Sequence, residues 1–260
     1  MAAPGGPLSM SKKTRLPAGH APLEQILFAQ GFGARRTCEG LILNGLVAVN
    51  GEVVDDPDAV FPEDGLPMTV DGQPWVTHVR ALVVLHKPAG YECSLKPGAW
   101  PGVHNLLPAP LRQRGLQPVG RLDQDTTGLL LMTDDGPLLH KLTSPKHHVP
   151  KVYEVTCKHP VTQAMCDKLL KGVVLDDDPE PVAADAAERV LQAGDAPDAE
   201  TLHLRLTLLQ GKYHQVKRMV AAVGNRVEGL HRSRIGRLTL PDDLAPGQWR
   251  WIDDPGVVLP

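Results

Sequence analysis

Apolar positions in the first quarter of the chain recur first at helical and then at strand spacing. Residues 23–30 place apolar side chains on one helical face, and residues 35–43 predict a second helix. Two short apolar runs at 46–49 and 52–54 flank Asn50-Gly51, a pair that is typical of a tight hairpin turn. Two helices followed by a hairpin predict a small, separate module.

The rest of the chain alternates between strand-like and helix-like patterns. A helical spacing followed by Gly224 predicts a helix over 213–223. Apolar runs and alternating segments predict four strands, at 81–86 (ended by Lys87-Pro88), 128–133, 152–157 and 202–208. Because these strands are separated by turns and short helices, the pattern predicts an α+β domain on a mixed, largely antiparallel sheet.

Composition divides the chain into three parts. Residues 1–20 are rich in Gly, Pro and Ala, and we expect them to form a flexible tail. Residues 57–73 are acidic and rich in turn-forming residues, and we place a domain boundary near Trp75. The predicted domains are therefore 21–75, with the helices and the hairpin, and 76–260, with the α+β pattern.

Length and composition argue against several classes of protein. Of the 260 residues 42% are apolar, enough for a buried core, but no apolar run approaches the roughly 18 residues of a membrane span. The N-terminus lacks a basic segment followed by an apolar one, so we expect no secretory signal and a cytoplasmic protein. The four cysteines form no C-x-x-C pair, which favours reduced thiols over a disulfide or zinc framework.

The net charge of −3 conceals a strong asymmetry along the chain. Residues 52–75 carry seven acidic and no basic side chains, whereas residues 205–237 carry eight Lys and Arg against the single acid Glu228. Screening confines charge effects to about 10 Å, so the local excess matters more than the total. The basic segment is a candidate for binding phosphates.

One stretch joins a polar loop to a buried strand. Residues 120–136 read GRLDQDTTGLLLMTDDG, so Asp123 and Asp125 directly precede an apolar run. A carboxylate on a rigid support is well placed for catalysis, although Asp-rich loops also serve as plain turns. The residue pattern alone leaves both roles open.

This stretch resembles the active-site motif of the pseudouridine synthases. Further segments that match the family occur in the family's order, at 87–91, 143–153, 211–219 and 230–236. The resemblance covers roughly residues 82–252. Residues 22–75 resemble an S4 RNA-binding domain. Family members usually open this domain with Arg-Leu-Asp, whereas this chain has Ala-Pro-Leu-Glu at 21–24 and lacks the basic residue. Arg35 and Arg36, at a helix start, are candidates for phosphate contacts there.

The resemblance implies that the protein converts a uridine in RNA to pseudouridine by flipping the base out of the RNA. It implies that Asp123 acts on the ribose, as nucleophile at C1′ or as base at the 2′ position, with Lys217 paired to it. Tyr153 would stack on the uracil and take the C5 proton, and Arg121 would fill the space left by the flipped nucleotide. Ile235 would pack beside the base, with a plain core role as an equal alternative. Further expected RNA contacts are Lys151, His214 and Arg218.

Two other functions compete with this hypothesis. A non-catalytic RNA-binding assembly factor would need no intact set of Asp123, Tyr153 and Lys217. A hydrolase would use Asp123 and Asp125 as a pair, whereas the resemblance gives Asp125 a structural role. We expect no metal and no cofactor, because the histidines lack metal-site spacing and no phosphate-binding glycine loop precedes Lys-Ser or Lys-Thr.

Strings near residues 90–94, 230–232 and 244–247 are most similar to family members that modify small-subunit rRNA. The expected partner is therefore 16S rRNA, free or within an assembling small subunit, with 23S rRNA as the alternative. The resemblance also implies a monomer with no membrane association.

Overall fold

The computed structural model describes residues 16–176 and 178–259, and these form two compact units. The first ends at Val79 and the second begins at Arg80. The boundary predicted near Trp75 falls inside a strand, β6 (Gln73–Val76), of the first unit's own sheet. Most of the predicted tail, residues 1–15, lies outside the described residues, and its last residue, His20, already begins strand β1.

The N-terminal unit is built from the helices and the hairpin that the sequence predicts. Helix α1 ends at Gly31, whose φ of 89° closes it in the left-handed region. Asn50 and Gly51 both have positive φ, as a two-residue hairpin turn requires. Strands β4 and β5 lie within the acidic segment that was expected to contain turns. The elements are β1 (His20–Pro22), α1 (Leu23–Gln30), α2 (Arg35–Leu43), β2 (Val47–Val49), β3 (Glu52–Val53), β4 (Val60–Pro62), β5 (Pro67–Val70) and β6.

The core of the N-terminal unit packs one face of the helix pair against the four-stranded sheet β3-β2-β5-β6. Leu23 and Leu27 of α1 and Ile42 of α2 are fully buried there. Burying each such side chain contributes about 1.5–3 kcal/mol, which lets two short helices persist that would be unstable alone.

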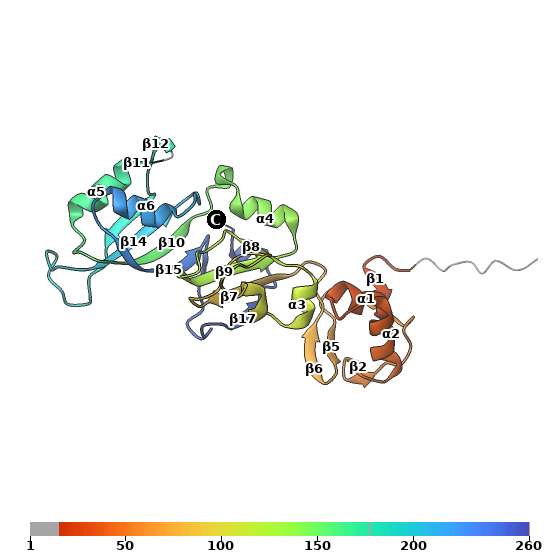
Figure 1. The fold of residues 1–260 in the computed structure, drawn as a ribbon. Coiled ribbons are helices and arrows are strands. Elements are labelled where there is room, and N and C mark those ends of the chain that lie inside the picture. Colours follow the sequence, from red (N-terminus) through yellow and green to blue (C-terminus); the bar gives the residue numbers. More distant parts are fainter. Residues whose placement is uncertain (1–15, 177, 260) are drawn as a thin grey trace, which may run out of the picture. The chain divides into compact units, whose positions relative to one another are not determined.

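The C-terminal unit is a mixed sheet flanked by short helices (Figure 1). Its main path runs β13-β14-β10-β15-β9-β7-β17, and every pairing is antiparallel except that of β15 with β9. The elements are β7 (Leu82–Lys87), η1 (Val103–Leu106), α3 (Ala109–Gln113), β8 (Gln117–Val119), β9 (Thr127–Thr133), α4 (Gly136–Thr143), η2 (Pro145–His147), β10 (Lys151–Cys157), α5 (Gln163–Lys171), β11 (Val173–Leu175), β12 (Asp178–Val182), β13 (Ala186–Arg189), β14 (His203–Leu208), α6 (Gln215–Ala222), β15 (Val227–Ile235), β16 (Leu238–Thr239), β17 (Trp249–Trp251) and η3 (Pro255–Val257). The predicted α+β, largely antiparallel architecture is confirmed.

Two predicted boundaries were wrong, for identifiable reasons. Strand β7 continues through Lys87, because the buried side chain of Lys87 finds backbone acceptors and does not require solvent. Helix α6 begins at Gln215 and not at Tyr213, because His214 before it takes a left-handed φ of 47°. This turn determines where His214 and Lys217 point.

The single parallel pairing brings the Asp123 loop next to β15. Gly128 of β9 faces Arg232 of β15, and a Cβ atom at Gly128 would lie 2.3 Å from the Arg232 carbonyl oxygen. Gly128 also has a φ of 108°, which side chains other than glycine rarely adopt. The close approach of the two strands therefore requires glycine at this position.

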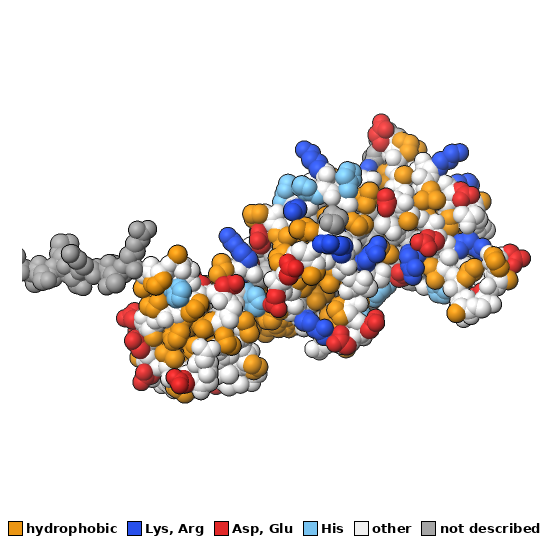
Figure 2. Space-filling view, turned by 180° about the vertical axis from the view of Figure 1, so that it is seen from behind, with side chains coloured by type: hydrophobic (Ala, Val, Ile, Leu, Met, Phe, Trp, Pro, Cys, Tyr) orange, Lys and Arg blue, Asp and Glu red, His pale blue; other side chains and the backbone are white. Residues whose placement is uncertain are grey.

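Charge is distributed unevenly over the surface. On the face shown in Figure 2, the charged side chains of the N-terminal unit are mainly acidic, while Lys and Arg are spread over the C-terminal unit. This agrees with the acidic segment 52–75 and the basic segment 205–237 of the sequence. No helix in the described part of the chain has both the length and the hydropathy needed to cross a bilayer.

Candidate active site

A buried lysine, Lys87, holds the loop between β8 and β9, residues 120–126, through hydrogen bonds to its backbone. The Lys87 side chain is fully buried, and its Nζ donates to the carbonyl oxygens of Thr126 at 2.7 Å, Pro88 at 3.1 Å and Gln124 at 3.3 Å. Desolvation lowers the pKa of Lys87. Gln124 directly follows Asp123, and Gln124 and Thr126 flank Asp125, so these bonds fix the loop backbone beside both carboxylates and Lys87 positions the loop.

Two carboxylates of this loop share one ammonium group from helix α6. Lys217 Nζ lies 3.0 Å from Asp123 Oδ2 and 2.8 Å from Asp125 Oδ1. Partial burial lowers the pKa of Lys217, but its hydrogen bonds to Asp125 and Asp123 outweigh this and raise it overall. Partial desolvation raises the pKa of Asp125, yet the hydrogen bond and charge of Lys217 lower it overall. Lys217 is therefore a cation, and Asp125 an anion, at neutral pH.

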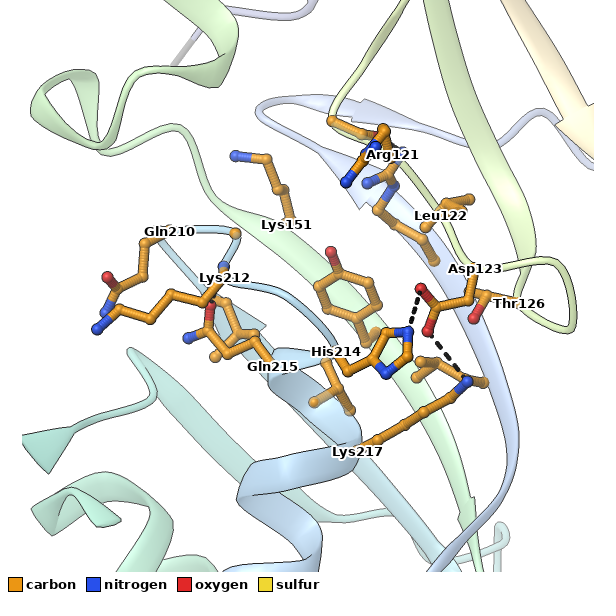
Figure 3. Close-up of a pocket in the computed structure, with 17 residues that line it drawn as sticks. Arg121, Leu122, Asp123, Thr126, Lys151, Gln210, Lys212, His214, Gln215 and Lys217 are labelled. Carbon is orange, nitrogen blue, oxygen red and sulfur yellow. Dashed lines mark hydrogen bonds and ion pairs between the residues drawn. The ribbon is translucent and has the colours of Figure 1, made fainter. Parts of the chain in front are cut away.

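The imidazole of His214 approaches Asp123 from the other side. His214 Nε2 lies 3.3 Å from Asp123 Oδ1, and its ring stacks on Tyr213 with centroids 3.8 Å apart. The left-handed backbone at His214 directs this ring toward the carboxylate rather than along α6. Asp123 thus has a basic group at each oxygen (Figure 3).

These groups border a cavity of about 100 Å³ that opens to a wider cleft of about 590 Å³. The two share Asp123, His214 and Lys217 in their walls. Tyr153 of β10, at 8% exposure, lines the inner cavity, together with Leu230 of β15. A carboxylate, an aromatic ring and aliphatic walls give this cavity the chemistry to hold a planar base next to its sugar.

The structure brings together most of the expected site residues. Those that line the inner cavity are Arg121, Asp123, Lys151, Tyr153, His214 and Lys217. Arg121 also lines the outer cleft and is exposed. Its place at the mouth suits a residue that contacts the RNA next to an everted nucleotide.

Two expected contacts lie elsewhere. Ile235 is fully buried in the core with Val149 and Val258 and lines neither the cavity nor the cleft, which fits the core role, while its contact with the base stays a prediction. The end of β15 packs into the core, whereas Leu230, five residues earlier, reaches the cavity. Arg218 also lies outside both walls, and its Nη1 donates to the Tyr213 carbonyl oxygen at 3.2 Å, which supports the turn before α6.

Arg35 and Arg36 lie at the exposed start of α2 in the N-terminal unit. Arg35 pairs with Glu24 at 3.1 Å and lies over the Phe28 ring at 4.8 Å. Glu24, which stands where the family usually has Asp, thus partly neutralises Arg35, while the guanidinium itself stays exposed.

Arg232 and Thr126 are among the residues of the inner cavity that sequence reasoning missed. Arg232 is 1% exposed, and it donates to the carbonyl oxygens of Leu129 at 2.9 Å and Gly120 at 3.0 Å. Thr126, also 1% exposed, has a hydroxyl oxygen without a hydrogen-bond partner. The alternation of side chains along strand residues 230–232, which places Leu230 and Arg232 on one face, was the available signal for Arg232. Nothing in the sequence marked Thr126.

Metal and thiol chemistry find no support at this site. Among the described residues, no group of three or more His, Cys, Asp or Glu side chains is placed to hold a metal ion. All four cysteines are buried and unpaired with one another. The Cys93 sulfur accepts a hydrogen bond from the Leu122 backbone at 3.5 Å, and burial raises the pKa of its thiol, so it supports the loop as a neutral group.

Comparison with known proteins agrees with this geometry. Residues 81–222 match the RNA pseudouridylate synthase family, and residues 22–59 match the S4 domain. The chain is 41% identical over 225 residues to ribosomal small subunit pseudouridine synthase A of Escherichia coli (strain K12), covering 85% of this chain and 92% of that protein. The protein of the same name from Pasteurella multocida is 38% identical over 224 residues, with the same coverage.

A solved structure gives the same result at the level of the fold. A crystal structure described as a pseudouridylate synthase superposes with a TM-score of 0.60 at 32% identity, covering 91% of this chain and 98% of that one. The matched family segment contains Asp123, Tyr153 and Lys217, which the geometry independently places around one cavity. The chain is therefore a member of the RNA pseudouridylate synthase family that carries an S4 domain.

Proposed function

We propose that this enzyme isomerises a uridine of small-subunit ribosomal RNA to pseudouridine, with Asp123 as the catalytic carboxylate. The observation that carries the proposal is the 3.0 Å contact between Asp123 and Lys217 in the wall of the cavity that Tyr153 lines. The choice of rRNA rests on the relatives named ribosomal small subunit pseudouridine synthase A. We further propose 16S rRNA, free or in an assembling subunit, as the partner of a cytoplasmic monomer.

In this mechanism the target nucleotide leaves its helix and its base enters the inner cavity. Unstacking costs a few kcal/mol, and contacts of the basic walls with phosphates offset this cost. Asp123 then acts at the ribose, either by bonding to C1′ or by taking the C2′ proton, while the N1–C1′ bond breaks. The base turns over Tyr153 and C5 bonds to C1′, while the Asp123–C1′ bond breaks or Asp123 returns the proton to C2′. The C5 proton then leaves and N1 takes up a proton.

Lys217 faces the carboxylate of Asp123 with a positive charge. Its ammonium nitrogen lies 3.0 Å from Asp123 Oδ2, so the ion pair orients the carboxylate at the cavity wall. The ammonium is itself held by Asp125, so it stays in place when Asp123 binds the substrate.

The same geometry disfavours the hydrolase hypothesis. A glycosidase pair needs one protonated carboxyl group as a general acid, whereas Lys217 holds the pKa of Asp125 below its usual value. We expect Asp125→Asn to retain conversion to within about tenfold, since an amide still accepts a hydrogen bond from Lys217. Single-turnover assays beside Asp123→Asn provide the measurement. Equal loss in both variants would mean that both carboxylates react.

Product analysis tests the proposed reaction. Small-subunit rRNA transcribed with [5-³H]uridine should release tritium to water as pseudouridine forms, with no free uracil. A hydrolase would release tritiated uracil, and a non-catalytic assembly factor would release neither. Presenting the same RNA free or with small-subunit proteins identifies the preferred substrate form.

The N-terminal unit is proposed to strengthen RNA binding through the exposed start of α2. Changing both Arg35 and Arg36 to Glu should weaken rRNA affinity about tenfold and lower the slope of log K against log salt by about 2, one for each lost phosphate contact. Titrations at several salt concentrations measure both quantities. Glu24→Gln is the matched control: it frees Arg35 from its ion pair and should preserve or tighten binding. Unchanged affinity in the double variant would remove α2 from the interface.

A further inference from the structure

The inner cavity contains a buried cation that the mechanism above does not use. Lys151 is 5% exposed, and its ammonium donates to the Val149 carbonyl oxygen at 3.0 Å. Within the described ranges it forms no ion pair with a carboxylate, and the charged side chain beside it is the equally buried guanidinium of Arg232.

Such an arrangement costs free energy in the unliganded protein. A buried ammonium loses hydration, and without an opposite charge nothing restores it. Burial, together with the charge of Arg232, lowers the pKa of Lys151 to about 8. A lysine kept in a reaction cavity at this cost is suited to a ligand that brings negative charge or a strong acceptor.

The position of Lys151 indicates which part of a bound nucleotide it would meet. Lys151 and Tyr153 are two residues apart on β10 and therefore point to the same face of the sheet. Figure 3 shows Asp123 and Lys217 at one side of the cavity and Lys151 on the other. Place the ribose C1′ of the bound nucleotide at Asp123 and the uracil ring on Tyr153. The ring atom opposite N1, which is C4, and its oxygen O4 then point toward Lys151.

We infer that Lys151 binds O4 of the everted uracil, selects uridine over cytidine, and stabilises the base when its glycosidic bond breaks. Cytosine carries an amino group at this position, and its hydrogens would face the ammonium donors. The inference rests on the proposed function, and it assigns the base-recognition role within that site. Arg232, adjacent to Lys151, adds positive charge at the same end of the cavity.

The charge balance explains why a cation is useful there. When N1–C1′ breaks, the bonding electron pair leaves with the base and spreads over N1, O2 and O4. The electron deficiency that this leaves at C1′ is relieved in one of two ways. Either C1′ bonds to the Asp123 carboxylate, or C2′ loses a proton to Asp123. When C5 bonds to C1′, the Asp123–C1′ bond breaks, or Asp123 returns the proton to C2′. The C5 proton then leaves and N1 takes up a proton, so the product is neutral pseudouridine and Asp123 is regenerated as a carboxylate. Lys151 keeps its proton throughout and stabilises only the intermediate charge.

The test compares Lys151→Met with Lys151→Arg and with Lys158→Met, an exposed lysine just beyond the end of β10. Lys151→Met should lower the single-turnover rate about 10–100-fold, as expected for loss of a charge-assisted hydrogen bond. Its melting temperature should stay equal or rise, because an unpaired buried charge has been removed. Lys151→Arg should restore part of the rate, and Lys158→Met should match the wild type in rate and stability.

An RNA with 4-thiouridine at the mapped target provides the second arm, since sulfur accepts hydrogen bonds poorly. The ratio of the conversion rate with uridine to that with 4-thiouridine should be about tenfold larger for the wild type than for Lys151→Met. An equal preference in both enzymes would overturn the O4 assignment. Weaker RNA binding with a smaller salt slope and an unchanged preference would instead place a phosphate at Lys151, and would also overturn it.

The two proposals fail separately. If the wild type converts no uridine, the proposed function is wrong. If the wild type is active while Lys151→Met matches its rate, or loses stability like a variant of a purely structural lysine, only the role of Lys151 is wrong.

Discussion

Asp123→Asn should abolish pseudouridine formation while leaving RNA affinity and the folded state nearly unchanged. The side chain is nearly isosteric, and Lys217 keeps its bonds to Asp125 at 2.8 and 2.9 Å, so no uncompensated charge remains. Binding depends on the basic walls and on the S4 domain, neither of which is altered. Single-turnover conversion, filter-binding affinity and thermal unfolding on the same preparations separate these effects.

The size of the loss measures how strongly the reaction depends on Asp123. Removal of a general base costs on the order of 10²–10⁴-fold, and removal of one member of a catalytic set that acts as a unit can cost on the order of 10⁶-fold. Conversion by Asp123→Asn at a rate near that of the wild type would remove this residue from the chemistry. Parallel loss of binding and conversion would assign it to RNA recognition instead.

Gly128→Ala should produce the largest loss of stability among single methyl additions in the core strands. The new Cβ would lie 2.3 Å from the Arg232 carbonyl oxygen and 2.7 Å from its amide nitrogen, both of them backbone atoms. Overpacking of this kind costs about 1–3 kcal/mol or more, and the strained φ adds about 1–3 kcal/mol. In a unit of this size each kcal/mol lowers the melting temperature by roughly 2–4 °C, so we expect a fall of about 10 °C.

Gly136→Ala is the matched control for this prediction. Gly136 begins helix α4, nothing lies within 4 Å of its added Cβ, and alanine favours a helix. Its melting temperature should equal or exceed that of the wild type. If Gly128→Ala has the same melting temperature as this control, the close approach of β9 and β15 does not constrain the fold as described.

The sequence predicted well those elements that depend on short-range signals. Helices α1 and α2 follow from local apolar spacing, and the β2–β3 hairpin follows from two residues that accept positive φ. The strand pattern around 128–133 was clear because both faces of β9 are buried. Of the site, Asp123, Tyr153 and Lys217 were predictable through the family motif, and the structure places them around one cavity.

Features that depend on distant segments were not predictable. In the sequence Lys87 marked the end of a strand, and Arg232 was counted in the basic segment 205–237. The burial of both side chains could not be predicted, because their acceptors are carbonyl oxygens of other loops and strands. For Ile235 the family resemblance suggested a contact with the base and the residue type a core role, and only the packing with Val149 and Val258 shows where it lies. Buried polar groups stabilised by remote backbone leave little trace in a local pattern.

The most direct test of the central claim maps pseudouridines in small-subunit rRNA from cells that lack this protein and carry either the wild-type chain or Asp123→Asn. The proposed function predicts one uridine that is modified with the wild type and unmodified with Asp123→Asn at equal protein level. Modification of that uridine by Asp123→Asn, or a small-subunit rRNA whose pseudouridines do not depend on the wild-type chain, would contradict it.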